Sequence, residues 1–328
     1  MPFLTSLFFG FAPMFLFSYI LYWTDRYERE PKVLLGAVFF WGVAIAAGGA
    51  YIVNTALGMG IYIFTGSESA TSFTTATLIA PVVEESLKGL AVLIVFLIFR
   101  KEFDSILDGI VYAGIVALGF AATENTIYIY RGFQSDGWEG LWLLTFIRVG
   151  LIGWIHPFFT SFTGIGFAIM RMRRSGIIKY AAPLIGFSIA IFTHAFHNGL
   201  ASILSGFGGL AIGSLLDWTG LFFMFLFLLW AVASDRNLLK KHLKEEYKLE
   251  LITAHQYHTA ISVWKQTSAR MRALSAGKYK ATKRFYQICG ELAHKKEQYH
   301  KLGNERNNLE IIEKNRVELA SLKDRALW

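Results

Sequence analysis

Long apolar runs separated by short polar loops dominate the first two thirds of this chain. Seven runs are long enough to cross a hydrocarbon core of about 30 Å as helices that rise about 1.5 Å per residue. The pattern therefore predicts an all-α membrane bundle of seven spans. These spans are 3–23, 33–53, 78–99, 106–130, 141–170, 180–203 and 210–233. The first run lacks a basic leading region and a small-residue cleavage site, so we expect a retained helix.

The pattern changes near Ser234 and Asp235. The segment beyond them contains no proline and holds 20 of the 32 Lys and Arg residues against 11 acidic ones, a net charge of +9. We therefore expect a transmembrane domain over residues 1–234 and a basic, helical, cytoplasmic domain over residues 235–328. Amphipathic helices in this tail are predicted to break around 275–277, Gly290 and 303–304.

Composition and charge placement refine this picture. Hydrophobic residues make up 54% of the chain and charged residues 17%, which is unlike a soluble domain, and a single cysteine, Cys289, excludes an intrachain disulfide. Alternate loops are basic, so the positive-inside rule predicts an external N-terminus and a cytoplasmic tail. The basic positions are Arg26, Arg29, Lys32, Arg100, Lys101, Arg171, Arg173, Arg174, Lys179, Arg236, Lys240 and Lys241, whereas the other loops hold only Arg131.

Four of the predicted spans carry ionisable or metal-binding side chains in their interior. A charge near the bilayer centre costs at least ~2.5 kcal/mol, so we expect these side chains to face one another and to serve chemistry or transport. With the predicted orientation, all of them fall at one depth in the outer half of the membrane. They are Glu84, Glu85 and Lys88, then Glu124 and Asn125, then His156, and finally His194, His197 and Asn198.

Helical spacing predicts how the first group is arranged. Glu84 and Lys88 are i,i+4 neighbours, so Lys88 can partly neutralise the pair, while Glu85 points about a quarter-turn away. Two adjacent carboxylates in a low dielectric do not both ionise easily, and one of them is suited to proton transfer. A structural ion pair is the alternative interpretation of these three residues. We interpret Arg148 as an interfacial residue that extends toward water.

The histidines form two further groups. His194, His197 and Asn198 have i, i+3 and i+4 spacing, which places two imidazoles and an amide on one stripe of a helix. Pro157 removes a backbone hydrogen bond, so a kink is expected beside His156. A kinked helix would open a water-accessible cavity at this depth.

These segments resemble the motifs of the PrsW family of intramembrane metalloproteases, which is related to the type II CAAX prenyl endopeptidases. EESLK at 84–88 is similar to the family's EExxK motif, FAATEN at 120–125 to FxxxEN, HP at 156–157 to the third motif, and HAFHN at 194–198 to the HxxxN-type final motif. The prenyl endopeptidases usually carry a histidine where this chain has Glu124. The resemblance therefore argues against processing of prenylated proteins.

The resemblance implies an endopeptidase of the bacterial cytoplasmic membrane. Its substrate would be a membrane-anchored, single-span protein, with an anti-sigma factor as precedent, cut near the extracytoplasmic side. A divalent metal, with zinc as the expected ion, would activate water while a glutamate takes the proton. The implied ligands are Glu124, His156 and His194, the implied base is Glu84 with Glu85 supporting it or binding metal, and Asn198 or His197 would stabilise the oxyanion.

Other functions stay open at this point. A proton- or metal-coupled transporter would use the same Glu and His residues as a relay, although no convincing inverted repeat supports it. A scaffold whose basic tail carries the function is a third possibility. The tail is expected to attract anionic lipid, and no nucleic-acid motif accompanies its charge. His255 and His258 in the tail are interpreted as solvated surface residues.

Overall fold

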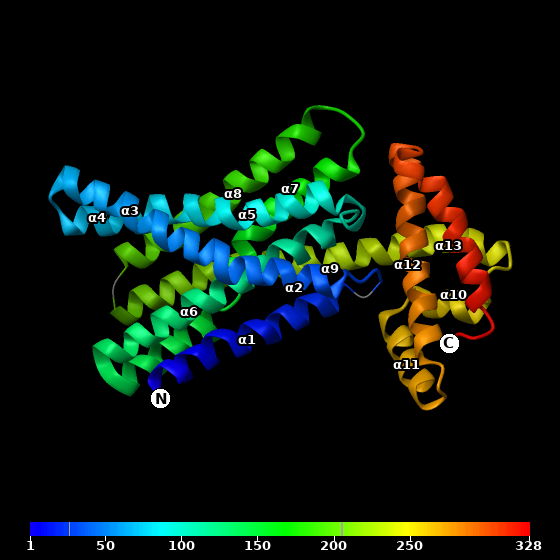
Figure 1. Cartoon of the computed structure of the whole chain (residues 1–328), viewed down its shortest axis with the longest axis horizontal. Coiled ribbons are helices and arrows are strands. Elements are labelled where there is room, and N and C mark those ends of the chain that lie inside the picture. Colours follow the sequence, from blue (N-terminus) through cyan, green and yellow to red (C-terminus); the bar gives the residue numbers. More distant parts are fainter. Residues whose placement is uncertain (26, 205) are drawn as a thin grey trace.

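The computed structural model describes residues 1–25, 27–204 and 206–328, and all regular structure in these ranges is helical, which confirms the predicted all-α class (Figure 1). Arg26, one of the basic residues used to predict orientation, lies outside the described residues. The elements are α1 (Pro2–Thr24), α2 (Lys32–Phe40), η1 (Trp41–Ala46), α3 (Ala47–Thr65), α4 (Glu68–Thr74), η2 (Thr75–Ile79), α5 (Ala80–Ile98), η3 (Arg100–Glu102), α6 (Ile106–Thr145), η4 (Phe146–Leu151), α7 (Ile155–Met172), α8 (Ile177–Ile203), α9 (Gly206–Lys248), α10 (Ala254–Ala260), α11 (Val263–Ser275), α12 (Tyr279–Leu302), η5 (Glu305–Asn307) and α13 (Asn308–Leu322).

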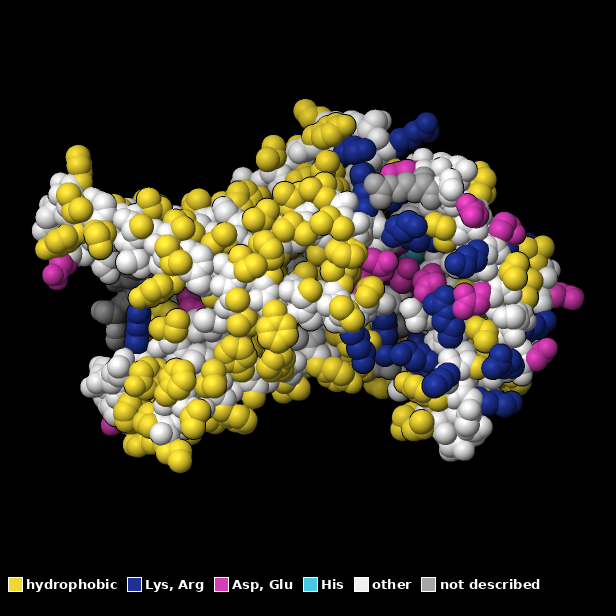
Figure 2. Space-filling model, viewed as in Figure 1, with side chains coloured by type: hydrophobic (Ala, Val, Ile, Leu, Met, Phe, Trp, Pro, Cys, Tyr) yellow, Lys and Arg dark blue, Asp and Glu magenta, His cyan; other side chains and the backbone are white. Residues whose placement is uncertain are grey.

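Five helices in the described part of the chain are long and apolar enough to cross a membrane. They are Pro2–Thr24, Lys32–Thr65, Ile106–Met172, Ile177–Ile203 and Gly206–Lys248. Helix α5, which carries three charged side chains, is not among them, and the long segment Ile106–Met172 counts once although it contains breaks. The number of seven spans therefore stays a prediction. Hydrophobic side chains cover the visible face of the bundle, as a lipid-facing surface requires (Figure 2).

The segment between the predicted fourth and fifth spans is more helical than expected. Helix α6 continues to Thr145 but reverses at Asp136 and Gly137, where Gly137 has a φ of 62° that favours glycine. After η4 the chain leaves helical geometry, and α7 begins at Ile155. Pro157 thus lies in the first turn of α7, where a missing N–H costs no internal hydrogen bond. The sequence predicted a kink beside His156, but the structure has the first turn of helix α7 at this position.

Helix α6 lies at the centre of the membrane bundle, with α1, α2, η1 and α7 packed around it. Its crossing with α7 depends on two glycines, because a Cβ built on Gly164 would lie 1.9 Å from the carbonyl oxygen of Gly109. Small residues at a crossing allow two helix backbones to approach closely. This approach holds the start of α7, with His156, beside the middle of α6, with Glu124.

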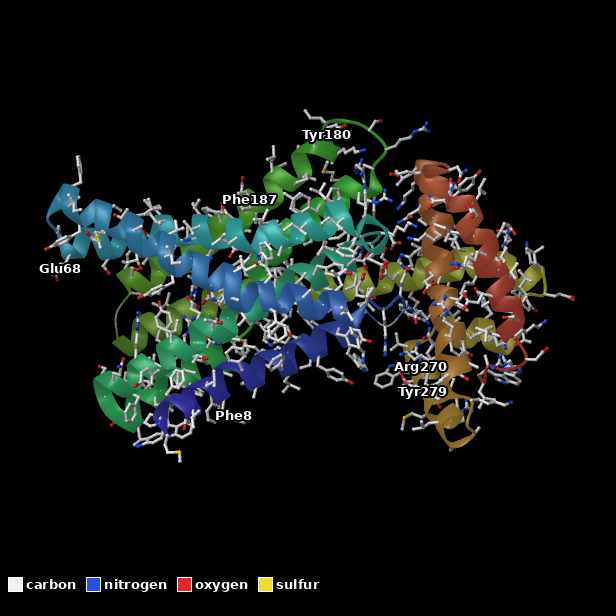
Figure 3. The ribbon with its side chains drawn as sticks, viewed as in Figure 1. Phe8, Glu68, Tyr180, Phe187, Arg270 and Tyr279 are labelled. Atoms are coloured by element: carbon white, nitrogen blue, oxygen red, sulfur yellow. The ribbon has the colours of Figure 1, made fainter. Side chains whose placement is uncertain are left out.

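The tail forms a separate hydrophobic cluster at one end of the bundle (Figure 1). Helix α9 runs from the bundle into this tail without a break at Ser234 and Asp235, so the division into two domains there stays a prediction. The predicted breaks near 275–277 and 303–304 are present, whereas Gly290 lies inside α12. Glu68 lies at the end of the bundle farthest from the tail (Figure 3).

Candidate active site

The polar residues of the four motifs meet in one cavity of about 440 Å³. It lies between α5, α6, α7, α8 and the beginning of α9, so segments more than 100 residues apart contribute to it. The motif residues that line it are Glu84, Glu124, His156, His194, His197 and Asn198. The structure thus brings polar residues of all four motifs to one cavity.

Glu85 is completely buried and both of its oxygens are engaged. Oε1 accepts a hydrogen bond from Lys88 Nζ at 2.8 Å and contacts His194, and Oε2 accepts one from the Thr160 hydroxyl at 2.8 Å. Lys88 Nζ lies farther from Glu84, at 3.6 Å. Lys88 therefore pairs mainly with the i,i+3 carboxylate, not with the i,i+4 carboxylate that spacing favoured. With three contacts from α5, α7 and α8, Glu85 positions its neighbours.

His194 is oriented by its contacts on two sides. Its Nδ1 lies 3.0 Å from Glu85 Oε1, and its ring stacks on Phe159 with centroids 4.7 Å apart. This leaves Nε2 facing Glu84 Oε2 at 3.8 Å. That oxygen is buried and has no hydrogen-bond partner among the described residues. A buried carboxylate oxygen that has only a long ion pair with Lys88 and lies beside an imidazole nitrogen indicates a place for a cation or a water.

His156 lies between Lys88 and Glu124. Its Nδ1 is 3.3 Å from Lys88 Nζ, and its Nε2 is 2.8 Å from Glu124 Oε2. A lysine ammonium can only donate, so in this arrangement Nδ1 accepts and Nε2 donates to the carboxylate. Phe120, the first residue of the FAATEN segment, lies under Lys88 with its ring centroid 3.9 Å from Nζ. The aromatic residue of that motif thus supports the buried ammonium.

Arg148 belongs to the site, which corrects its interpretation as an interfacial residue. Its side chain is 14% exposed, and it donates to Glu124 and, at 3.0 Å, to Asn125 Oδ1. The partly buried carboxylate of Glu124 pairs with Arg148, because a charge left unpaired in this site would be costly. The sequence signal was present, since Arg148 falls within a predicted span.

The second half of the final motif reaches toward α9 and η2. His197 Nδ1 lies 2.9 Å from Asp217 Oδ2, and Asn198 donates to the carbonyl oxygen of Ala76 at 2.8 Å. Sequence reasoning missed Asp217, although it is the only charged residue of the predicted span 210–233. It also missed Thr160, whose hydroxyl gives no signal in a sequence.

Three of these residues form a group that fits a metal ion. Glu84, His156 and His194 are buried, and each offers one ligand atom within 4.8 Å of the others. Two imidazoles and a carboxylate are donors that zinc prefers in catalytic sites, which keep a further position open. Glu124 contacts His156 from the side of α6. The predicted ligand set of Glu124, His156 and His194 stays a prediction.

Comparison with known proteins agrees with this arrangement. Residues 30–232, more than half of the chain, match the PrsW-protease family, described as PrsW family intramembrane metalloprotease. The chain belongs to the PrsW family. The match covers all four motifs and ends near the point where the basic tail begins.

Curated relatives carry the same family name. The chain is 38% identical over 106 residues to "Protease PrsW" of Clostridioides difficile (strain 630), which is 32% of this chain and 42% of that protein. It is 36% identical over 121 residues to "Protease PrsW" of Geobacillus kaustophilus (strain HTA426) and 31% identical over 121 residues to that of Bacillus subtilis (strain 168). These two matches cover 37% of this chain and 50% and 51% of the relatives.

The chain therefore spans about half the length of the curated relatives it matches. No solved structure matches the chain.

Proposed function

We propose that this protein is an intramembrane, metal-dependent endopeptidase that cleaves a membrane-anchored protein. The observation that carries the proposal is the buried Glu84, whose Oε2 has no hydrogen bond among the described residues, faces His194, and lines the cavity together with His156 and Glu124. Membership of a family described as intramembrane metalloproteases supports the same chemistry.

His156 and His194 would hold the metal together with a carboxylate, with His156 binding through Nε2 after that nitrogen loses the proton it donates to Glu124. The metal, with zinc as the expected ion, would polarise the scissile carbonyl and activate a water molecule. Glu85 keeps His194 in one orientation through Nδ1, which presents Nε2 to the cavity. Such a carboxylate–histidine contact fixes the tautomer and the ring position of a ligand.

The two cavity carboxylates differ in their suitability as a base. Arg148 and His156 contact Glu124 and hold it as a charged carboxylate, which suits a ligand. Glu84 keeps one oxygen without a hydrogen-bond partner among the described residues and can accept the proton of water. We therefore assign Glu84 as base and Glu124 as ligand. The rival assignment makes Glu84 the ligand, as its grouping with the two histidines allows.

Asn198 and His197 are placed to stabilise the developing oxyanion. Both line the cavity. Asn198 uses one amide hydrogen for the Ala76 carbonyl and retains a second, and Asp217 contacts Nδ1 of His197, which leaves Nε2 for the substrate. Donors fixed in place before the reaction stabilise charge more effectively than water does.

The proposed substrate is a single-span membrane protein, such as an anti-sigma factor, cut near the extracytoplasmic side of a bacterial cytoplasmic membrane. Residues at the start of α9, Gly206 and Gly209, line the cavity, whereas the basic tail follows the end of the same helix. The site therefore lies at the end of the bundle opposite the tail. With the tail in the cytoplasm, as the positive-inside rule predicts, the site faces outward.

The decisive experiment combines cleavage and flux in sealed proteoliposomes that contain the purified protein and a tagged single-span protein. We expect cleavage that a membrane-permeant chelator stops and that added Zn²⁺ restores, with no proton or metal flux. The Ser86→Ala variant is the control, because Ser86 is exposed on the same helix and bonds only to the backbone of Val82. Flux without cleavage of any tested single-span protein would favour the transporter.

A further inference from the structure

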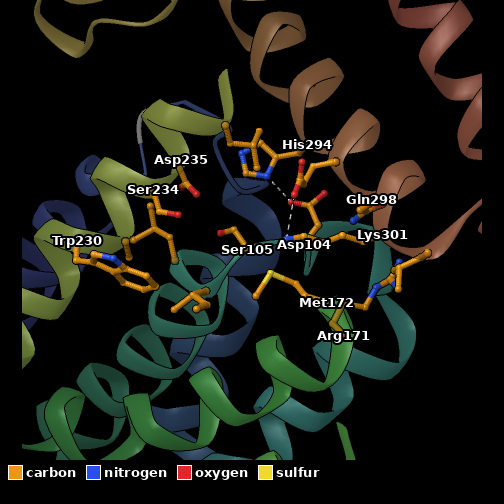
Figure 4. Close-up of a pocket in the computed structure, with 16 residues that line it drawn as sticks. Asp104, Ser105, Arg171, Met172, Trp230, Ser234, Asp235, His294, Gln298 and Lys301 are labelled. Atoms are coloured by element: carbon orange, nitrogen blue, oxygen red, sulfur yellow. Dashed lines mark ion pairs between the residues drawn. The ribbon is translucent and has the colours of Figure 1, made fainter. Parts of the chain in front are cut away.

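A second cluster of ionisable groups lies between the membrane bundle and the tail, far from the proposed active site. It combines Glu28 from the connection between α1 and α2, Asp104 from the connection between η3 and α6, and His294 from α12. Each offers a ligand atom within 4.8 Å of the others. Figure 4 shows His294 and Asp104 facing each other across this junction, with Asp235 on the far side of the imidazole.

His294 is buried in this junction, where it forms ion pairs with Asp104 and Glu28 but no hydrogen bond to a described residue. Its side chain is 3% exposed, and among the described residues neither ring nitrogen has a hydrogen bond of acceptable geometry. Glu28 Oε2 is buried and equally without a hydrogen bond in the described part of the chain. Buried polar atoms are nearly always satisfied, so two unsatisfied residues that face each other indicate a missing ligand.

The spacing of the three ligand atoms matches a metal site. His294 Nδ1 lies 3.1 Å from Asp104 Oδ1 and 3.6 Å from Glu28 Oε2. Zinc binds nitrogen and oxygen at about 2.0–2.2 Å, which places neighbouring ligands of a tetrahedral ion about 3.4 Å apart. A single ion can therefore reach all three residues once their side chains adjust.

The charge around the cluster also calls for a cation. Three further carboxylates interact electrostatically with His294, and Lys295 pairs with Asp104 Oδ2 at 2.7 Å; these carboxylates are Asp25, Asp108 and Asp235. Asp108 is not a ligand candidate, because Oδ2 accepts hydrogen bonds from the backbone N–H groups of Asp104 and Ser105 and Oδ1 accepts one from the Ser105 hydroxyl. The carboxylates of Asp25, Glu28, Asp104 and Asp235 outnumber the ammonium group of Lys295 that pairs with the cluster.

The cluster is accessible to ions and water. A cavity of about 210 Å³ is lined by Asp104 and His294 and is large enough to supply water as further ligands (Figure 4). Helix α12 is held close by Gly290, where a Cβ would lie 2.1 Å from the Tyr27 carbonyl oxygen. The contact fixes α12 one turn before His294 against the connection that carries Glu28.

We propose that Glu28, Asp104 and His294 bind a divalent transition-metal ion that fastens the tail to the membrane bundle. Imidazole and carboxylate ligands suit ions of the zinc class. Because the ligands come from three segments, the ion would couple the docking of α12 to the metal supply on the tail side of the membrane. Glu28 and His294 lie outside the family match, so family membership does not account for this site.

Metal content provides the first test, on full-length purified protein equilibrated with Zn²⁺. The His294→Ala variant should lose one equivalent per chain relative to wild type, whereas His300→Ala, an exposed histidine of the same helix, should lose none. In a His194→Ala background, which removes a proposed active-site ligand, the remaining equivalent should disappear when His294→Ala is added. Metal binding at the second site is thereby measured separately from metal binding at the proposed active site.

Docking of the tail provides a second readout. Zn²⁺ should slow hydrogen exchange of residues 279–302 in wild type and in His300→Ala but not in His294→Ala. Glu28→Gln, which keeps the side-chain shape, should weaken Zn²⁺ binding at least tenfold and guards against misfolding of the alanine variant. Unchanged metal content in His294→Ala and Glu28→Gln would overturn the proposal. So would exchange that is insensitive to Zn²⁺ in wild type, because a protonated His294 would then bridge the two carboxylates.

Discussion

Glu85 and His194 are separated by 109 positions in the chain, yet Oε1 of one lies 3.0 Å from Nδ1 of the other. Because Glu85 also accepts hydrogen bonds from Lys88 and Thr160, it is held by α5 and α7 while it orients a histidine of α8. Glu84, the preceding residue on α5, faces the opposite nitrogen, Nε2, of the same imidazole. One carboxylate thus fixes the geometry, and its neighbour faces the cavity.

The first prediction concerns Glu84. Glu84→Gln should lower cleavage by at least about 100-fold, because a positioned acid–base group contributes about 10²–10⁴-fold. Cleavage of the co-reconstituted substrate and the metal content of the purified variant are measured together, with Ser86→Ala as control. Retained metal supports Glu84 as the base. Loss of metal together with cleavage would instead make Glu84 a ligand with His156 and His194.

The second prediction concerns the buried pair of Glu85 and Lys88. Removing either charge by Glu85→Gln or Lys88→Met should cost about 3 kcal/mol, because the partner is left buried without compensation. The double variant should be more stable than the sum of both losses implies. Unfolding in mixed micelles measures the four free energies of the cycle. Strictly additive losses would show that the two side chains do not depend on each other.

The third prediction concerns Arg148. Arg148→Gln should weaken metal binding or cleavage by about 10–100-fold, the usual effect of removing a group that orients a metal ligand. Arg148→Lys should recover only part of this loss, because an ammonium does not reproduce the two contacts to Glu124 and Asn125. Arg131→Gln, which alters an exposed arginine of α6, is the control. Full activity in Arg148→Gln would exclude Arg148 from the site.

The fourth prediction concerns the tail. A chain truncated after Lys248, where α9 ends, should still bind metal at the membrane site and cleave, because α5, α6, α7 and α8 supply the proposed catalytic groups. It should be less stable, since Tyr27 and Leu239 lose the cluster that buries them. Cleavage and metal content are compared with the full chain at equal membrane insertion. If both vanish although the spans remain inserted, the tail is part of the site.

Much of the site is recognisable in the amino-acid sequence alone. Glu84, Glu124, His156 and His194 stand out because the bilayer makes each buried polar group expensive, so such residues seldom occur without a partner. For the same reason the sequence predicts that they meet. It does not predict that Lys88 pairs with Glu85 and not with Glu84. Neighbours at i,i+3 and i,i+4 are both within reach on a helix, and the side-chain conformations decide which pair forms.

The sequence by itself determined the class of molecule, an all-α membrane protein with a basic tail, because apolar periodicity and charge are local properties of the chain. Only the tertiary structure decided which side chains touch. Arg148 and Asp217 became site residues, and Glu28, Asp104 and His294 came together, through the way helices cross and the tail docks. Those contacts join positions that are distant in the chain, and no local pattern encodes the distance between two helices.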